Sequence, residues 1–232
     1  MGLTVSSTGK NAVVGSLAVE KQHDGDRIIA LAGNPNVGKS TVFNALTGLN
    51  QHTGNWPGKT VGSAQGAHHF HGTDYILVDL PGTYSLMAHS PEEEVARDFL
   101  LYGGADAAIV VCDATCLERN LNLVLQTMEI TPNVVVCVNL LDEARKKGIR
   151  IDLAALESEL GVPVVGTSAR AGKGLSDLMD TVRRLTGGEI VTKPRLIRYP
   201  RPVEEALAVL TPVIEQHVGA NINARWLSLR LL

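Results

Sequence analysis

Residues 28–48 read IIALAGNPNVGKSTVFNALTG: an apolar run, a glycine-bounded loop and then a run with helical spacing. The loop fits the pattern G-x-x-x-x-G-K-[ST] between a strand and a helix, which is the context that a phosphate-binding loop requires. Glycine at Gly33 and Gly38 lets the backbone amides turn toward phosphates, and the helix beginning near Lys39 directs its positive end the same way. A glycine turn with a surface lysine is the alternative interpretation. The pattern favours a nucleotide-binding α/β protein.

The composition is consistent with that fold class. Of the 232 residues, 44% are hydrophobic but only 4% are aromatic, and there are 23 glycines, which is typical of an aliphatic α/β core with many tight turns. The formal net charge of −3 argues against nucleic acid as the partner. Three cysteines favour a reducing compartment, and no apolar run reaches the roughly 18 residues that span a bilayer, so we expect a soluble chain.

The chain divides into three parts. Residues 1–25 are polar and lack periodicity, and we expect a flexible N-terminal segment. Over residues 26–187, short β-branched runs alternate with helical patterns, which predicts a P-loop fold with a mostly parallel six-stranded sheet flanked by helices. Residues 188–232 are expected to form a linker and the start of a small helical domain.

The expected strands are 27–32, 65–71, 74–79, 107–112, 133–138 and 163–166, and the expected helices are 39–47, 91–102, 117–128, 152–160 and 174–186. Strands 65–71 and 74–79 are expected to form a hairpin, which places one antiparallel strand at the edge of the sheet.

A second motif, Asp-Leu-Pro-Gly at residues 79–82, follows a predicted strand. Asp79 can hold a magnesium ion that also binds Ser40, and the amide of Gly82 can contact a terminal phosphate. Hydrolysis would remove that contact and release the segment that follows, as in GTPase switch loops. Lys39 is expected to reach the β- and γ-phosphates. The complete predicted phosphate loop is Gly33, Asn34, Pro35, Asn36, Val37, Gly38, Lys39, Ser40 and Thr41.

The base is indicated by the string VVVCVNLLDE, which ends a predicted strand with Asn139 and Asp142. A carboxylate at Asp142 accepts the N–H groups on the edge of guanine, whereas adenine presents an acceptor there. Backbone amides near Ser168 and Ala169, in TSARAGKG, can meet the guanine oxygen. The pattern therefore predicts GTP and GDP as ligands and disfavours an ATP-dependent kinase.

Four strings, GNPNVGKSTVFNALTG, NWPGKTVG, DLPGTYSL and NLLDEARKKG, together resemble the cytosolic G domain of the ferrous iron transport protein B (FeoB) family. The similarity runs from about Ile28 to Leu185, and the tail resembles that family's helical spacer domain. The resemblance implies a GTP-hydrolysing regulatory domain on the cytoplasmic side of a bacterial inner membrane, whose partner is a C-terminal Fe²⁺ permease portion of the same chain. Small accessory transport proteins and a homo-oligomer are further partners that it allows.

The same resemblance implies roles for single residues. Thr60 matches the switch threonine that binds Mg²⁺ when the terminal phosphate is present, and Asn36 matches an asparagine that helps hold K⁺ between the phosphates. Thr83 follows DLPG, where signalling GTPases carry a glutamine that orients water. We therefore expect slow turnover, stimulated by K⁺. The residues expected to carry catalysis are Lys39, Thr60, Gly82 and Asn36.

Other interpretations remain open at this stage. A soluble ribosome- or RNA-associated GTPase shares GxPNVGKS but usually carries a basic domain, and a nucleotide sensor would bind GTP and scarcely hydrolyse it. The helical tail either transmits movement or stabilises bound GDP. Trp56 fits an exposed or a packed position equally well. His69 with His71, and Cys112 with Cys116, could be metal ligands, but a solvated edge strand and buried thiols are favoured.

Overall fold

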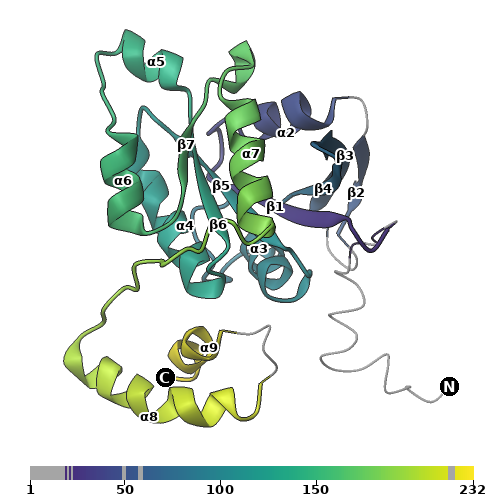
Figure 1. Ribbon diagram of the computed structural model, residues 1–232. Helices are drawn as coiled ribbons and strands as arrows, with labels where there is room; N and C mark the ends of the chain where they lie inside the picture. The colour runs from purple at the N-terminus through teal and green to yellow at the C-terminus, as the bar shows by residue number, and fades with distance from the viewer. Residues whose placement is uncertain (1–18, 20, 22, 49–50, 57–59, 219–222) are drawn as a thin grey trace, which may run out of the picture.

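A single β-sheet with helices on both faces forms the centre of the molecule (Figure 1). The computed structural model describes residues 19, 21, 23–48, 51–56, 60–218 and 223–232. Most of the predicted N-terminal segment, residues 1–25, lies outside the described residues, as do residues 57–59 of the NWPGKTVG string.

Strands and helices alternate along most of the chain. In order they are β1 (Arg27–Gly33), α2 (Lys39–Thr47), β2 (Gln51–Asn55), β3 (Gly62–Phe70), β4 (Thr73–Asp79), α3 (Pro91–Tyr102), β5 (Ala107–Asp113), α4 (Leu117–Ile130), β6 (Val134–Asn139), α5 (Leu141–Lys146), α6 (Leu153–Leu160), β7 (Val164–Gly166), the 3₁₀ helix η1 (Ala169–Ala171), α7 (Leu175–Thr186), α8 (Arg201–Glu215) and α9 (Ala224–Leu231).

The sheet has the strand order β2-β3-β4-β1-β5-β6-β7. Among the described strands only β3 runs against the others, because it pairs antiparallel with both of its neighbours. The carboxyl ends of β1, β4, β5, β6 and β7 therefore lie at the same edge of the sheet. In open α/β sheets ligands bind at this edge. The predicted phosphate loop, Asp-Leu-Pro-Gly, Asn139 with Asp142, and Ser168 with Ala169 each lie at or just after the end of one of these strands, whereas Thr60 follows β2.

We expected six strands, but the described residues form a sheet of seven. The missed strand is β2, whose sequence QHTGN is polar and contains a glycine, so it lacks the apolar alternation that signals a half-buried strand. It occupies the edge next to β3, where Gln51 pairs with Gly66 and Asn55 with Gly62. The antiparallel strand β3 is consequently not at the edge, and it begins at Gly62 rather than at residue 65.

Two hydrophobic clusters sandwich the sheet because successive side chains of a strand point to opposite faces. On β1, Ile28, Ala30 and Ala32 face a cluster with α3 and α4, whereas Ile29 and Leu31 face a cluster with α2 and α7. The strand is thus buried on both faces, as a central parallel strand must be. This burial fixes the position of the loop that leaves its carboxyl end.

The predicted linker is bound to the α/β part over its first half. Residues 189–200 form no helix or strand, but the Lys193 amide donates to Gly161 O at 2.9 Å and the Arg195 amide to Leu160 O at 2.9 Å. The Thr192 hydroxyl donates to Pro132 O at 2.8 Å. These bonds hold the segment against the C-terminal end of α6 and the loop that follows α4.

Helices α8 and α9 lie side by side below the sheet (Figure 1). Trp226 of α9 is 8% exposed and belongs to the cluster on the α4 face. Tyr199, just before α8, donates its hydroxyl to Glu129 of α4 at 2.7 Å. In the described part of the chain, no helix is both long and apolar enough to cross a bilayer.

A matched pair of alanine substitutions tests whether the linker is fixed. Gly148 and Gly161 have φ values of 72° and 71°, but a Cβ at Gly148 meets nothing within 4 Å, whereas one at Gly161 would lie 2.0 Å from Lys193 O. We expect Gly148→Ala to cost about 1 kcal/mol through left-handed strain. Gly161→Ala should cost at least about 1 kcal/mol more, because the hydrogen bonds to the linker are lost as well. Chemical denaturation measures both, and equal losses would contradict a docked linker.

Candidate nucleotide-binding site

The phosphate loop leaves the sheet at Gly33, where a Cβ would lie 2.8 Å from Val111 O on the neighbouring strand. Two residues of the loop, Asn36 and Gly38, have left-handed φ values of 68° and 82°. Helix α2 begins at the next residue, Lys39. The local structure is therefore the strand, glycine loop and helix that the sequence predicts. It directs the first turn of a helix into the loop, which suits an anionic ligand.

The side chain of Lys39 joins the two phosphate motifs. It is 8% exposed, and its Nζ donates to the Asp79 carboxylate and, at 2.6 Å, to Leu80 O. Burial raises the pKa of the Asp79 carboxyl, and the neighbouring ammonium opposes this rise. A buried lysine and a half-buried carboxylate are each costly alone, so the pair stabilises both charges at this point.

The Asp-Leu-Pro-Gly segment lies along the phosphate loop. The Leu80 amide donates to Leu31 O at 2.9 Å, and the Thr83 amide donates to Gly33 O at 3.2 Å. A Cβ at Gly82 would lie 3.4 Å from the Cα of Pro35. Gly82 itself is exposed, so its backbone lies at the surface next to the loop.

Asn139, at the end of β6, connects three loops. It is 1% exposed, its Nδ2 donates to Val37 O at 3.1 Å, and its Oδ1 accepts from the Thr167 hydroxyl and the Ala169 amide, both at 3.0 Å. A Cβ at Gly38 would lie 2.5 Å from that Nδ2, so the loop glycine leaves room for the carboxamide. We predicted that Asn139 contacts the base, but in this structure its carboxamide makes hydrogen bonds that hold three loops together.

Asp142 lies in the first turn of α5, and its amide donates to the Ser168 hydroxyl at 3.2 Å. Burial raises the pKa of the Asp142 carboxyl, but hydrogen bonds from Ser168 and from the amides of Asp142 and Glu143 bring that pKa below its usual value. The side chain is therefore an ionised acceptor at neutral pH. The predicted base-reading residues Asp142, Ser168 and Ala169 lie together.

Sequence reasoning missed Thr167, whose hydroxyl orients Asn139 and which is 1% exposed. The available signal is its place directly after the strand and before Ser168. Asn34, which was predicted, is 3% exposed, and within the described residues neither its Nδ2 nor its Oδ1 has a hydrogen-bond partner. An orphaned buried amide is unfavourable by about 1–3 kcal/mol. Because Asn34 lies in the predicted phosphate loop, a polar ligand bound there could supply the missing hydrogen-bond partners.

The predicted magnesium residues come together only in part. Ser40 and Thr41 are exposed on the first turn of α2, and Asp79 lies at the neighbouring strand end. Thr60 is also exposed, and among the described residues no hydrogen bond ties it to Ser40 or Asp79.

The question about Trp56 is settled in favour of packing. Trp56 is 3% exposed, its ring lies 5.4 Å from that of Phe99 in an edge-on arrangement, and its amide donates to Val61 O at 2.8 Å.

The two cysteines differ in burial, whereas the two histidines are both exposed. Cys112 is buried and Cys116 is exposed, and burial raises the pKa of the Cys112 thiol well above its usual range. His69 and His71 are both exposed, but the expected edge strand is wrong, because β3 lies between β2 and β4 and ends at Phe70.

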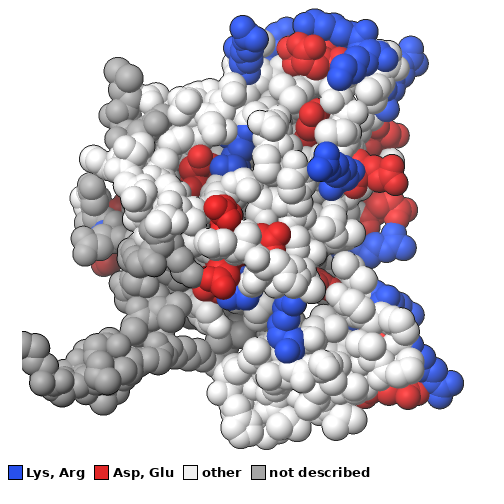
Figure 2. Space-filling view, turned by 180° about the vertical axis from the view of Figure 1, so that it is seen from behind, with Lys and Arg blue, Asp and Glu red and all other residues white. Residues whose placement is uncertain are grey.

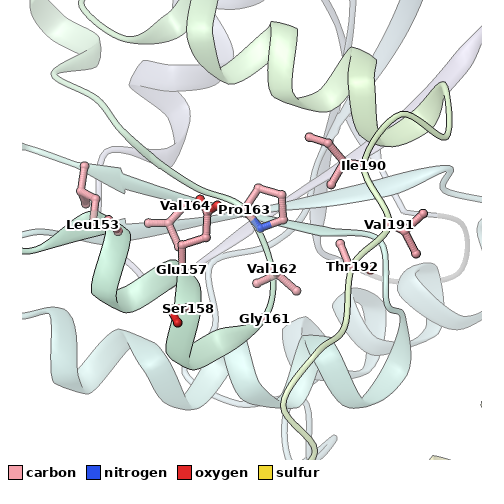
Figure 3. A pocket seen from close by; sticks show the side chains of 11 residues that line it. Leu153, Glu157, Ser158, Gly161, Val162, Pro163, Val164, Ile190, Val191 and Thr192 are labelled. Carbon is pink, nitrogen blue, oxygen red and sulfur yellow. The ribbon is translucent and has the colours of Figure 1, made fainter.

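A cavity of about 550 Å³ lies elsewhere, between α6, the start of β7 and the linker (Figure 3). Leu153, Val162, Pro163, Ile190 and Val191 give it a largely apolar lining. It lies at the amino end of β7, opposite the edge that carries Ser168. An apolar lining at that end is unsuited to phosphates, so the four loops are the better candidate for the nucleotide site.

Comparison with known proteins accords with this geometry. The family described as "Ferrous iron transport protein B" matches residues 27–182. The chain belongs to this family. The matched region corresponds to the N-terminal G domain of FeoB, and at the level of the family it is a GTPase domain.

The relatives include the Fe(2+) transporter FeoB of Escherichia coli (strain K12), 41% identical over 210 residues, which are 88% of this chain and 26% of the relative. The chain thus spans about a quarter of the length of the curated relatives it matches. Among solved structures, the cytosolic domain of T. maritima FeoB in apo form has a TM-score of 0.82 at 39% identity, covering 89% of this chain and 81% of that one. The same domain in its GMPPNP form gives the same TM-score, identity and coverage.

Thr167→Val tests the positioning of Asn139. Loss of one hydrogen bond to Oδ1 should weaken binding of a fluorescent GDP analogue about 3- to 10-fold, corresponding to roughly 1 kcal/mol. The matched control is Thr127→Val, since Thr127 is also buried but donates to Leu123 O within α4. Equal affinities in both variants would show that Thr167 has no positioning role.

Proposed function

We propose that this chain binds guanine nucleotides with Mg²⁺ and hydrolyses GTP, as the cytosolic regulatory domain of a bacterial Fe²⁺ transporter. The observation that carries the proposal is the hydrogen-bonded assembly of four loops at one edge of the sheet, joined by Lys39 to Asp79 and by Asn139 to Val37, Thr167 and Ala169. An assembly of this kind presents phosphate, metal and base contacts at fixed separations.

The phosphate end of the site rests on residues 33–41. The loop amides and the first turn of α2 supply partial positive charge, and Lys39 supplies a full charge close to the β- and γ-phosphates. In this structure Lys39 binds the Asp79 carboxylate. On nucleotide binding, the ammonium would exchange that carboxylate for phosphate oxygens, and Gly82 would offer its amide to the terminal phosphate.

The donor chemistry fits Mg²⁺. The ion prefers oxygen ligands, and the Ser40 hydroxyl and the Asp79 carboxylate lie on the adjoining loops, with the Thr60 hydroxyl on the switch segment as a further ligand. Mg²⁺ bound there would offset negative charge on the β- and γ-phosphates. The orphaned carboxamide of Asn34 marks the same loop as one that accommodates further polar groups.

The base end rests on Asp142, Ser168 and Ala169. The ionised Asp142 would accept two N–H groups of guanine. The amides of Ser168 and Ala169 donate here to Lys173 O and Asn139 Oδ1, so on nucleotide binding one of them would exchange that partner for the guanine oxygen. Discrimination against adenine follows because that base would leave the carboxylate unpaired.

The solved relatives support a guanine nucleotide as the ligand, since their titles name GDP and GMPPNP forms. We propose that the remainder of the transporter is a membrane portion C-terminal to this chain, since the curated relatives, named Fe(2+) transporters, are about four times as long. Accessory transport proteins and a homo-oligomer remain proposals of the same kind.

The alternative, a ribosome- or RNA-associated GTPase, is less well supported by the surface. On the face shown in Figure 2, acidic and basic side chains are interspersed, with basic ones gathered at the upper edge, the end at which α5 lies. Arg145, Lys146, Lys147 and Arg150 of that region are exposed. Nucleic-acid partners usually select a broader basic face.

Hydrolysis is expected to be slow and faster in K⁺ than in Na⁺. The exposed Asn36, held at φ 68° in the phosphate loop, is placed to offer its carboxamide oxygen to a monovalent cation beside the phosphates. We expect K⁺ to raise kcat at least about 10-fold, a small part of the roughly 10³–10⁵ that an arginine supplies. Asn36→Ala should abolish the stimulation by K⁺. The control Asn133→Ala should keep it, because Asn133 precedes β6 at the end of the sheet opposite the phosphate loop. Phosphate release in the two salts measures this, and equal rates for the unmodified chain would refute it.

Asp142→Asn tests the base assignment. The variant should lose about 10²- to 10⁴-fold in affinity for guanine nucleotides, because two charge-assisted hydrogen bonds are lost, and it should gain affinity for xanthine nucleotides. Asp177→Asn is the matched control, since Asp177 also lies in the first turn of a helix and is exposed. Competition against a fluorescent GDP analogue gives both affinities. Retention of guanine preference by Asp142→Asn would overturn the assignment.

A further inference from the structure

A second group of ligating side chains lies at the amino ends of β1 and β4, the opposite end of the sheet from the nucleotide loops. His23, Asp26 and Asp74 each offer one ligand atom, and these atoms all lie within 4.8 Å of one another. Asp26 immediately precedes β1, and Asp74 is the second residue of β4. Residues from two segments far apart in sequence thus meet at one point.

The separation of two of these atoms suits a shared ion. His23 Nδ1 lies 3.6 Å from Asp26 Oδ1. Two ligands bound tetrahedrally at about 2.1 Å from a metal are about 3.4 Å apart, which is longer than a hydrogen bond. The observed distance falls within the range of an ion pair, and it also suits two ligands of one ion.

The turn that carries this pair is well defined. Asp26 is 4% exposed, and its Oδ2 accepts from the His23 amide at 2.9 Å, while its own amide donates to His23 O at 3.0 Å. These bonds fix the backbone of His23 relative to the carboxylate.

The third ligand is positioned by a neighbour. Asp74 Oδ1 lies 2.6 Å from the Nδ1 of His69, the residue opposite it on β3. Hydrogen bonds to ligating side chains from such outer partners commonly orient metal ligands. The nearby cations Lys21 and Arg27 are both directed to Asp106, each at 3.1 Å.

We propose that His23, Asp26 and Asp74 bind one divalent first-row transition-metal ion, with His69 orienting Asp74. One imidazole with two carboxylates suits ions such as Fe²⁺, Mn²⁺ and Zn²⁺, whereas Mg²⁺ takes oxygen ligands in a near-octahedral arrangement. The choice of Fe²⁺ as the physiological ion rests on the proposed transport function. The existence of the site does not, because it follows from these residues alone.

The test is an anaerobic titration of the untagged 232-residue chain with Fe²⁺ alone, without nucleotide or Mg²⁺, in competition with a chromogenic chelator. We expect one tightly bound ion per chain. His23→Ala and Asp74→Asn should each raise its Kd at least 10- to 100-fold, and His69→Ala about 10-fold. Millimolar Mg²⁺ should not displace the ion. Asp26 is left unchanged because it also holds the turn.

The matched control is His217→Ala, which removes an exposed histidine at the end of α8 and should leave the Kd unchanged. An unchanged Kd in both His23→Ala and Asp74→Asn, or an equal loss in His217→Ala, would overturn the site. Each variant is also titrated with a fluorescent GDP analogue. Unaltered GDP binding shows that the variants are folded, and it separates failure of the metal site from failure of the proposed GTPase function.

Discussion

The carboxamide of Asn139 is the interaction on which the candidate site depends. It makes hydrogen bonds to the phosphate loop, to the end of β7 and to the turn that follows, so it fixes the phosphate end of the site relative to the base end. Because the group is buried, each bond carries the desolvation penalty of its partner if it is lost, and the network acts as a unit. The requirement for glycine at Gly38 follows from the same contact, since any side chain there would displace the carboxamide.

The pairing of Lys39 with Asp79 places a second constraint on the site. Both side chains are largely buried, so neither charge can be left alone without a large desolvation cost. On the proposed function, Lys39 moves to phosphate oxygens as Asp79 takes up Mg²⁺, and each charge keeps an opposite partner throughout. Nucleotide and metal binding are then coupled, because nucleotide alone would leave Asp79 unpaired and metal alone would displace Lys39. The raised pKa of Asp79 has the same cause, since burial disfavours the charged carboxylate.

The sequence predicted those parts of the site whose chemistry is contained in one short segment. The phosphate loop and Asp79 were located because glycine, lysine and aspartate act there at fixed local spacing. Thr167 was missed because it acts through Asn139, 28 positions away, and no local pattern records that contact. The strand β2 was missed because an edge strand needs no apolar alternation. The packing of Trp56 could not be decided because its partner, Phe99, lies on α3, far along the chain from the loop that carries Trp56.

The position of the tail bears on how a nucleotide signal could leave the G domain. The segment after Asp-Leu-Pro-Gly is held at Leu86, whose amide donates to Gln126 Oε1 at 2.6 Å and whose carbonyl accepts from Arg230 of α9 at 3.3 Å. A hydrogen bond at the longer distance contributes little by itself. Burial contributes more, since Leu86 and Trp226 belong to one hydrophobic cluster and burying such a side chain is worth about 1.5–3 kcal/mol. The segment after Asp-Leu-Pro-Gly and α9 are therefore joined by one hydrogen bond and by a shared hydrophobic cluster, and on the proposed function this is the contact through which the tail would respond to the nucleotide.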